Sequence, residues 1–303
     1  MHRLKGDDLS PNASELSALT RLFSSAVFQE MAKKGRSPLF KRLLERTHIA
    51  AHRDSDATVG SAFDSAFSIL KVAGLRGEYV YRAALIKNIL MGKHSLRTAS
   101  ILNEFRAGAC KADLVILNGT ASVYEIKSER DSLARLANQV ENYKRVFATV
   151  NVIVSESHVA NVRRLVPDDV GIMRLSRRYH ISVEREAVDR PDRICPVTVF
   201  ESVRSAEATA ILKALGVAVP TVPNTQRRGV LRELFADLDP TTLHREMVLT
   251  LKRTRNLAPL RELVDQLPAS LYAAALSVPV RRLDHGRLVK AVATPLDAAM
   301  AWV

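Results

Sequence analysis

The sequence is poor in the features that would place it among secreted, disulfide-rich or membrane proteins. It has two cysteines in 303 residues, too few for a disulfide framework or a cysteine-based metal knuckle. No apolar run approaches the roughly 20 residues that a transmembrane helix needs. The charged segment Met1–Asn12 is not followed by an apolar stretch. We therefore expect a cytoplasmic protein with no secretory signal and no membrane partner.

Two catalytic motifs are also missing. The chain has no Gly-x-x-x-x-Gly-Lys-Ser/Thr string, so it carries no P-loop for binding ATP. It has no Gly-x-Ser-x-Gly string either, which argues against a serine hydrolase of the α/β type. Any catalytic residues of the chain therefore belong to neither motif.

Positive charge is abundant. The formal net charge is +13 and the sequence pI is about 10.0. A basic chain attracts a polyanion, because lysine and arginine release the counterions condensed on phosphates. The alternative is that these side chains form a solvated surface that only confers solubility. Charge favours nucleic acid as the partner but does not distinguish DNA from RNA.

The hydrophobic pattern predicts a mixed order of elements. An amphipathic helix is expected over Ser10–Lys34, with further helical segments up to residue 76. The order then becomes helix, three strands, helix and strand. The predicted ranges are Glu78–Met91, Thr98–Phe105, Lys111–Leu117, Ala121–Ser128, Asp131–Phe147 and Thr149–Ser155.

The remaining signals suggest three regions. A helix over His158–Leu165 and strands over Gly171–Leu175 and Ile181–Arg185 extend the central region. We predict a helical region over 1–76, a core over 77–190 and a mostly helical region over 191–303. The last region is a candidate surface for DNA, for a protein partner or for a second copy of the chain.

Candidate catalytic residues lie in two neighbouring predicted strands. Alternate side chains of a strand share a face, so Glu125 and Lys127 point the same way. If the Asn118-Gly119 turn joins the strands as a hairpin, Asp113 and Glu125 converge near one end. Paired carboxylates suit a hard divalent cation such as Mg²⁺. The alternative is that the three charges lie on a solvated edge strand.

The triplet Asp113, Glu125 and Lys127, within this order of elements, resembles the PD-(D/E)XK nuclease superfamily over about Gly77–Ser155. Gln139 and Tyr143 resemble a Gln-x-x-x-Tyr pair that some exonuclease branches carry. The string from Tyr124 to Leu136 is similar to the signature of a little-characterised bacterial family of that superfamily. Ala112 stands where the superfamily name has proline.

The resemblance implies an α/β fold with a restriction-endonuclease-like core between helical flanks, and a Mg²⁺- or Mn²⁺-dependent deoxyribonuclease, with RNA left open as an alternative to DNA. It implies that Asp113 and Glu125 ligate the metal and that Lys127 assists the attacking water. A further acidic site residue is either Glu78 or Glu104, of which we favour Glu104 as a catalytic candidate.

Arg130 and Arg135 are candidates for phosphate contacts and Tyr143 for a contact with nucleic acid. Gln139 is a catalytic candidate that orients the site or contacts the substrate. The alternatives are a solvated helix surface headed by Asp131 as N-cap for the arginines, and core packing for Tyr143. We therefore expect a metal-dependent nuclease acting on DNA. The competing hypothesis is a nucleic-acid-binding or regulatory protein that keeps the fold without the chemistry.

Overall fold

The computed structural model describes residues 11–51, 55–72, 74–92, 96 and 98–303. The chain forms two compact units, Met1–Leu75 with Leu263–Val303, and Arg76–Glu262. The predicted C-terminal region 191–303 is thus divided between the two units. Ser10, the expected start of the first helix, and the rest of the N-terminal segment before it lie outside the described residues.

The first unit is helical and joins the two ends of the chain. Phe40 packs on Phe63 and on Trp302, with ring centroids 5.2 and 5.9 Å apart. Its helices are α1 (Ala13–Leu22), α2 (Ser25–Lys34), α3 (Pro38–Leu44), α4 (Val59–Leu70), α13 (Tyr272–Ser277), α14 (His285–Val292) and α15 (Leu296–Ala299), and α12 (Arg261–Asp265) spans the boundary between the units.

The single helix predicted to end at Lys34 is wrong, because the chain forms two helices there. Asn12 caps α1 by accepting the amide N–H of Glu15 at 2.9 Å. Ser24 then adopts an extended conformation, which breaks the helix before α2 begins. The apolar periodicity continues through the break, so the hydrophobic pattern alone did not reveal it.

The second unit is built on one mixed sheet. Within the described residues its six strands are ordered as they occur in the chain, and β3–β4 and β4–β5 are parallel while the other pairs are antiparallel. The strands are β1 (Ser100–Ala107), β2 (Cys110–Asn118), β3 (Thr120–Lys127), β4 (Thr149–Ser155), β5 (Gly171–Leu175) and β6 (Ile181–Arg185). The predicted strands are confirmed within two residues at each end.

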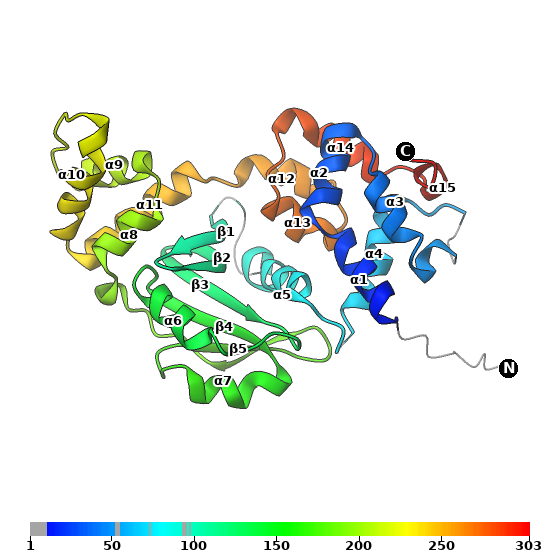
Figure 1. Cartoon of the computed structure of the whole chain (residues 1–303), viewed down its shortest axis with the longest axis horizontal. Helices are drawn as coiled ribbons and strands as arrows, with labels where there is room; N and C mark the ends of the chain where they lie inside the picture. Colours follow the sequence, from blue (N-terminus) through cyan, green and yellow to red (C-terminus); the bar gives the residue numbers. More distant parts are fainter. Residues whose placement is uncertain (1–10, 52–54, 73, 93–95, 97) are drawn as a thin grey trace. The chain divides into compact units, whose positions relative to one another are not determined.

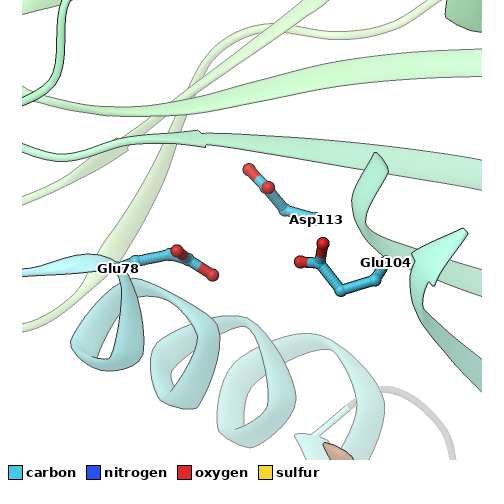
Figure 2. Close-up of side chains that lie close together, drawn as sticks. All are labelled: Glu78, Glu104 and Asp113. Carbon is cyan, nitrogen blue, oxygen red and sulfur yellow. The ribbon is translucent and has the colours of Figure 1, made fainter. Parts of the chain in front are cut away.

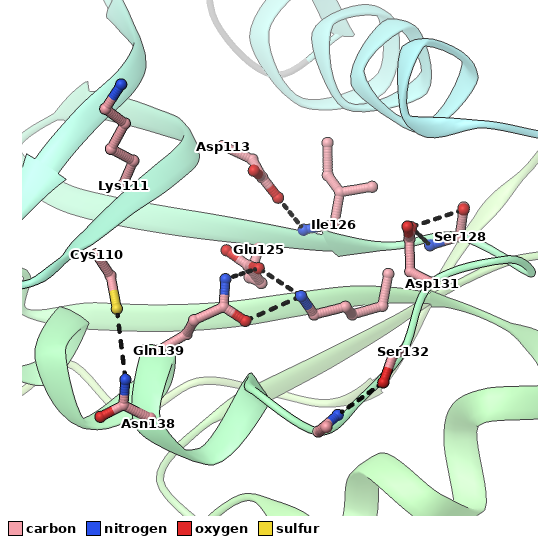
Figure 3. A network of polar contacts seen from close by, with 12 residues as sticks. Cys110, Lys111, Asp113, Glu125, Ile126, Ser128, Asp131, Ser132, Asn138 and Gln139 are labelled. Carbon is pink, nitrogen blue, oxygen red and sulfur yellow. Dashed lines mark hydrogen bonds and ion pairs between the residues drawn. The ribbon is translucent and has the colours of Figure 1, made fainter.

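Helices cover this sheet on both faces. α5 (Glu78–Leu85), extended by a π-helical turn (Ile86–Met91), and α6 (Leu136–Lys144) lie on opposite sides of β3 (Figures 1 and 3). α6 buries Leu136, Val140 and Tyr143 in the main core. The other helices of the unit are α7 (Val159–Leu165), α8 (Pro196–Ser202), α9 (Ser205–Ala214), α10 (Asn224–Ala236) and α11 (Pro240–Thr254).

The predicted start of the long helix at Asp131 is wrong. α6 begins five residues later, at Leu136. Asp131 instead holds the preceding turn, because its Oδ2 accepts hydrogen bonds from the amide and the hydroxyl of Ser128 at 2.8 and 2.7 Å.

Among the described residues, no helix is long and apolar enough to cross a membrane.

Candidate functional site

The β2–β3 hairpin brings the predicted charged residues together. Asn118 pairs with Thr120 around Gly119, whose φ of +74° is the left-handed conformation that glycine tolerates. Leu114 pairs with Tyr124 at the other end of the ladder, so the next positions outward are Asp113 and Glu125. The expected hairpin is confirmed, and both carboxylates lie near its open end.

Glu125 is the centre of a buried hydrogen-bond network (Figure 3). Its side chain is 2% exposed, and its Oε1 accepts the Lys127 ammonium at 2.7 Å and the Gln139 amide at 2.5 Å. Gln139 Oε1 in turn accepts a second N–H of Lys127 at 2.9 Å. The negative charge of Glu125 is therefore matched by an equally buried positive charge.

Tyr143 completes the network from α6. Its hydroxyl lies 2.7 Å from Glu125 Oε2 and 2.8 Å from the carbonyl oxygen of Lys111, and it can donate to one of them at a time. Burial and the neighbouring Glu125 carboxylate raise the pKa of Tyr143 far above its usual range. Gln139 and Tyr143, one helical turn apart, thus both act on Glu125, while the Tyr143 ring also packs in the core.

Asp113 lies on the other side of β3, toward α5 (Figure 3). Its Oδ2 accepts the amide N–H of Ile126 at 2.8 Å. Burial and the nearby Glu125 raise the pKa of Asp113 to about 7, although the Ile126 bond opposes the shift. The ionised carboxylate is therefore in a poorly solvated place where a cation would stabilise it.

Two glutamates complete a second group around Asp113. Carboxylate oxygens of Glu78, Glu104 and Asp113 all lie within 4.8 Å of one another, and the three side chains point toward a common space (Figure 2). Glu78 begins α5 and Glu104 lies in β1. We name these three residues the acidic trio. The prediction left Glu78 and Glu104 as alternatives, and the structure brings both to Asp113.

Glu104 reaches the trio through an irregularity in β1. Its φ is +50°, which an L-residue rarely adopts, and the β1–β2 ladder skips it between Asn103 and Phe105. On β2, Ala112 and Val115 both belong to the main core although they are three residues apart. The regular alternation of faces therefore fails beside Asp113, which lies on the opposite side of β3 from Glu125.

Arg82 is the functional candidate that the sequence reasoning missed. It is buried, its guanidinium bonds Glu78 and donates to Asn103 Oδ1 at 3.2 Å, and it lies 3.6 Å from Glu104 Oε1. The signal was its position four residues after Glu78 on a helix, a spacing at which side chains meet. Arg82 neutralises part of the charge of the acidic trio.

The two groups have different chemical capacities. Three carboxylates with one arginine offer the oxygen ligands that Mg²⁺ or Mn²⁺ prefers, so the residues of the acidic trio fit a divalent cation. Glu125 already accepts hydrogen bonds on both oxygens. Its role as a second metal ligand stays a prediction, whereas its role in holding Lys127 is visible.

The two arginines that are predicted to contact phosphate lie on the irregular segment that joins β3 to α6. Arg130 and Arg135 are exposed on the stretch between β3 and α6, and neither forms an ion pair with any described residue. Their predicted contact with nucleic acid therefore stays a prediction.

Comparison with known proteins gives a consistent family. The sequence profile of the family described as "Bacteriophage P4 protein cII" matches residues 71–264, which include every candidate site residue. Protein cII of Enterobacteria phage P4 is 28% identical over 202 residues, covering 65% of this chain and 74% of that protein. A solved protein of unknown function from Silicibacter pomeroyi is 20% identical and covers 39% of this chain and 80% of its own, with a TM-score of 0.28.

Proposed function

The chain belongs to the bacteriophage P4 protein cII family, and from the geometry of its site we propose that it is a metal-dependent nuclease that hydrolyses phosphodiester bonds of DNA. The observation that carries the proposal is the place of Asp113. Asp113 belongs to the acidic trio, which fits a divalent cation, and it bonds the amide of Ile126, which lies in β3 between Glu125 and Lys127, the pair that offers a buried ammonium.

The acidic trio is proposed to hold Mg²⁺ or Mn²⁺ through Asp113, with Glu78 and Glu104 as further ligands and Glu125 as a ligand that rearranges. Such a cation would polarise the phosphodiester and lower the pKa of a bound water. Burial and the neighbouring Glu125 disfavour the ionised form of Asp113, so binding a cation relieves an existing cost. A bound cation would therefore stabilise the ionised form of Asp113.

Lys127 is proposed to orient the attacking water and to stabilise charge developing on the phosphate oxygens. Within the described residues its ammonium donates to Glu125 and Gln139, which leaves one of its three N–H groups for such an oxygen. Glu125 and Gln139 fix the position of the ammonium. Arg130 and Arg135 are proposed to contact flanking phosphates.

The arrangement also supports the proposed relationship to the PD-(D/E)XK superfamily. α5, β1, β2, β3, α6 and β4 follow one another in the order expected for a restriction-endonuclease-like core. Asp113, Glu125 and Lys127 lie on the two strands where the resemblance puts them. The absence of proline at Ala112 leaves this arrangement intact.

One observation favours a second candidate function, a nucleic-acid-binding protein without cleavage. Both oxygens of Glu125 are bonded to Lys127, Gln139 or Tyr143, which closes Glu125 to a metal unless a bond is exchanged. A permanently closed network would leave a stable, basic scaffold with no hydrolytic activity.

The test is to incubate the full-length protein with linear and circular DNA, single- and double-stranded, in Mg²⁺, in Mn²⁺ and in EDTA. The variants are Asp113→Asn and Lys127→Met. Glu141→Gln is the matched control, because Glu141 is an exposed carboxylate on the same helix as Gln139. We expect metal-dependent cleavage in the wild type and the control, and a loss of about 100-fold or more in either site variant.

Cleavage that persists in Asp113→Asn would overturn the nuclease proposal. DNA binding without cleavage in every metal and on every substrate would favour the second function. Circular substrates also separate endonuclease from exonuclease action, since only an endonuclease cuts a closed circle.

A further inference from the structure

The turn between β5 and β6 is a tight hairpin that exposes two adjacent arginines. Ser176 accepts the amide N–H of Tyr179 at 3.0 Å, and the Ser176 amide donates to the His180 carbonyl at 2.8 Å. Tyr179 adopts a φ of +60°, the position at which a hairpin of this kind usually has glycine. Arg177 and Arg178 occupy the exposed centre of the turn.

A buried arginine holds this hairpin in place. Arg76 is 1% exposed, and its guanidinium donates to the carbonyl oxygens of Leu175 and Ser176 at 3.2 and 2.8 Å and of Arg177 at 2.7 Å. Burying a guanidinium is costly unless its donors are used. Three bonds to consecutive carbonyls therefore fix the turn that carries the arginines.

The hairpin lies at the same end of the sheet as the carboxyl end of β3, the strand that carries Glu125 and Lys127. β3, β4 and β5 are parallel, with Lys127 beside Val154 and Ser155 beside Leu175. Their carboxyl ends consequently meet at one edge. The Tyr179 hydroxyl donates to the carbonyl of Val80 at 3.4 Å, two residues after Glu78 on α5. The hairpin is thus attached to α5, the helix that supplies Glu78 of the acidic trio.

The arginines of the hairpin differ in how they are paired. Arg174 at its base engages Glu184 at 2.7 Å and Glu156 at 3.4 Å. The Arg177 side chain is 85% exposed and lies 3.8 Å from Glu156, which Arg174 already shares. Arg178 forms no ion pair with any described residue. Two arginines at the tip are therefore available to an anion.

We propose that the tip of this hairpin, Arg177 with Arg178, binds the phosphate backbone of DNA and positions it over the end of β3. A turn whose backbone is already fixed loses little backbone entropy when its two guanidinium groups bind a phosphate. Backbone contacts of this kind position a nucleic acid without reading its sequence. The inference rests on the proposed function for its substrate, but it concerns binding and not cleavage.

The test measures DNA binding by the full-length protein in EDTA, by fluorescence anisotropy of a labelled duplex, a labelled single strand and an RNA of the same sequence. The variant is Arg177→Ala with Arg178→Ala. The matched control is Arg164→Ala with Arg253→Ala, which removes two exposed arginines from α7 and α11 of the same unit. Thermal unfolding checks that both variants are folded.

We expect the hairpin variant to weaken duplex binding by about tenfold or more, and to reduce the slope of log K against log salt by about 1–2. The control should change both quantities much less. Equal losses in the two variants, or unchanged binding in the hairpin variant, would overturn the inference. A wild type that binds RNA but not DNA would overturn it too.

The outcome also separates this inference from the nuclease proposal. Weakened DNA binding in the hairpin variant supports the proposed role of the hairpin tip even if the wild type cleaves nothing. If cleavage requires Asp113 but the hairpin variant binds DNA as the wild type does, the nuclease proposal stands and the proposed role of the hairpin tip is wrong.

Discussion

Asp113 connects the two groups of the candidate site, and its ionisation couples the site to stability. Burial, Glu125 and Glu78 raise the pKa of Asp113 to about 7, whereas an unfolded aspartate titrates near about 3.9. Between these values the folded chain keeps a proton that the unfolded chain has lost. The stabilising effect is therefore complete below about pH 4 and is lost as the pH rises through about 7.

Replacing Asp113 by asparagine should remove this pH dependence. Asparagine keeps an oxygen for the Ile126 amide and removes one negative charge from the acidic trio. In EDTA at pH 8 we expect the free energy of unfolding in urea to rise by roughly 1–2 kcal/mol, with little change at pH 4. Asp168→Asn, at an exposed carboxylate, is the control. A variant less stable than wild type at pH 8 would contradict the prediction.

At the scale of a strand, the irregularity of β1 combines a backbone cost with a functional side chain. Glu104 has a φ of +50° and carries one of the three carboxylates of the trio. Glu104→Gly should relieve both the backbone strain and the repulsion, and stabilise the protein by roughly 0.5–1 kcal/mol. Glu104→Gln relieves the repulsion alone and should gain less. Thermal unfolding of both variants in EDTA makes the comparison, and equal effects would show that strain contributes nothing.

Arg76 is expected to hold the β5–β6 hairpin as a unit. Arg76→Met removes three bonds to hairpin carbonyls and should cost roughly 1–3 kcal/mol of stability. In this variant the amides of Ser176 and Tyr179 should exchange hydrogen faster than in the wild type, whereas the amides of β4 should exchange as in the wild type. Arg164→Met on α7 is the control for loss of an exposed arginine. If hairpin exchange rates stay at the wild-type level, the turn is held by its own bonds and by Tyr179.

The order of elements in the sheet unit could be predicted because each strand has a clear apolar alternation or a buried run. Thr149–Ser155, Gly171–Leu175 and Ile181–Arg185 agree with the structure at both ends. The start of α6 could not be predicted, because Asp131 suits a helix cap as well as the turn it forms. The break between α1 and α2 was hidden for a similar reason, since apolar spacing continues across it.

The geometry of the candidate site was predictable in part. Glu125, Lys127 and Gln139 meet in one hydrogen-bond network, because a hairpin and a following helix suffice to bring them together, whereas Asp113 bonds the Ile126 amide on the other side of β3. The partition into an acidic trio and a Glu125 network depends on the left-handed Glu104, which no local pattern signals. Arg82 was missed because its partners lie on a distant strand as well as on its own helix.

At the scale of the whole molecule, the sheet and the following helices share one core. Phe200, Phe235 and Leu243 from α8, α10 and α11 belong to the same buried cluster as Val115 and Val123 of the sheet. A core that ended at residue 190, as the sequence suggested, would leave this apolar surface in water. The compact unit Arg76–Glu262 instead coincides closely with the family match over residues 71–264.

Two fragments test whether the sheet folds alone or needs the helices that follow residue 190. The fragment 71–264 keeps the sheet together with α8 to α11, so we expect a single cooperative unfolding transition and native-like protection of β3 and β4 amides. The fragment 77–190 loses those helices and Arg76, which anchors the β5–β6 hairpin. It should aggregate or unfold without cooperativity. Circular dichroism and hydrogen exchange on both fragments give the answer. Cooperative folding of 77–190 would show that the C-terminal helices are dispensable and would restore the three-region division.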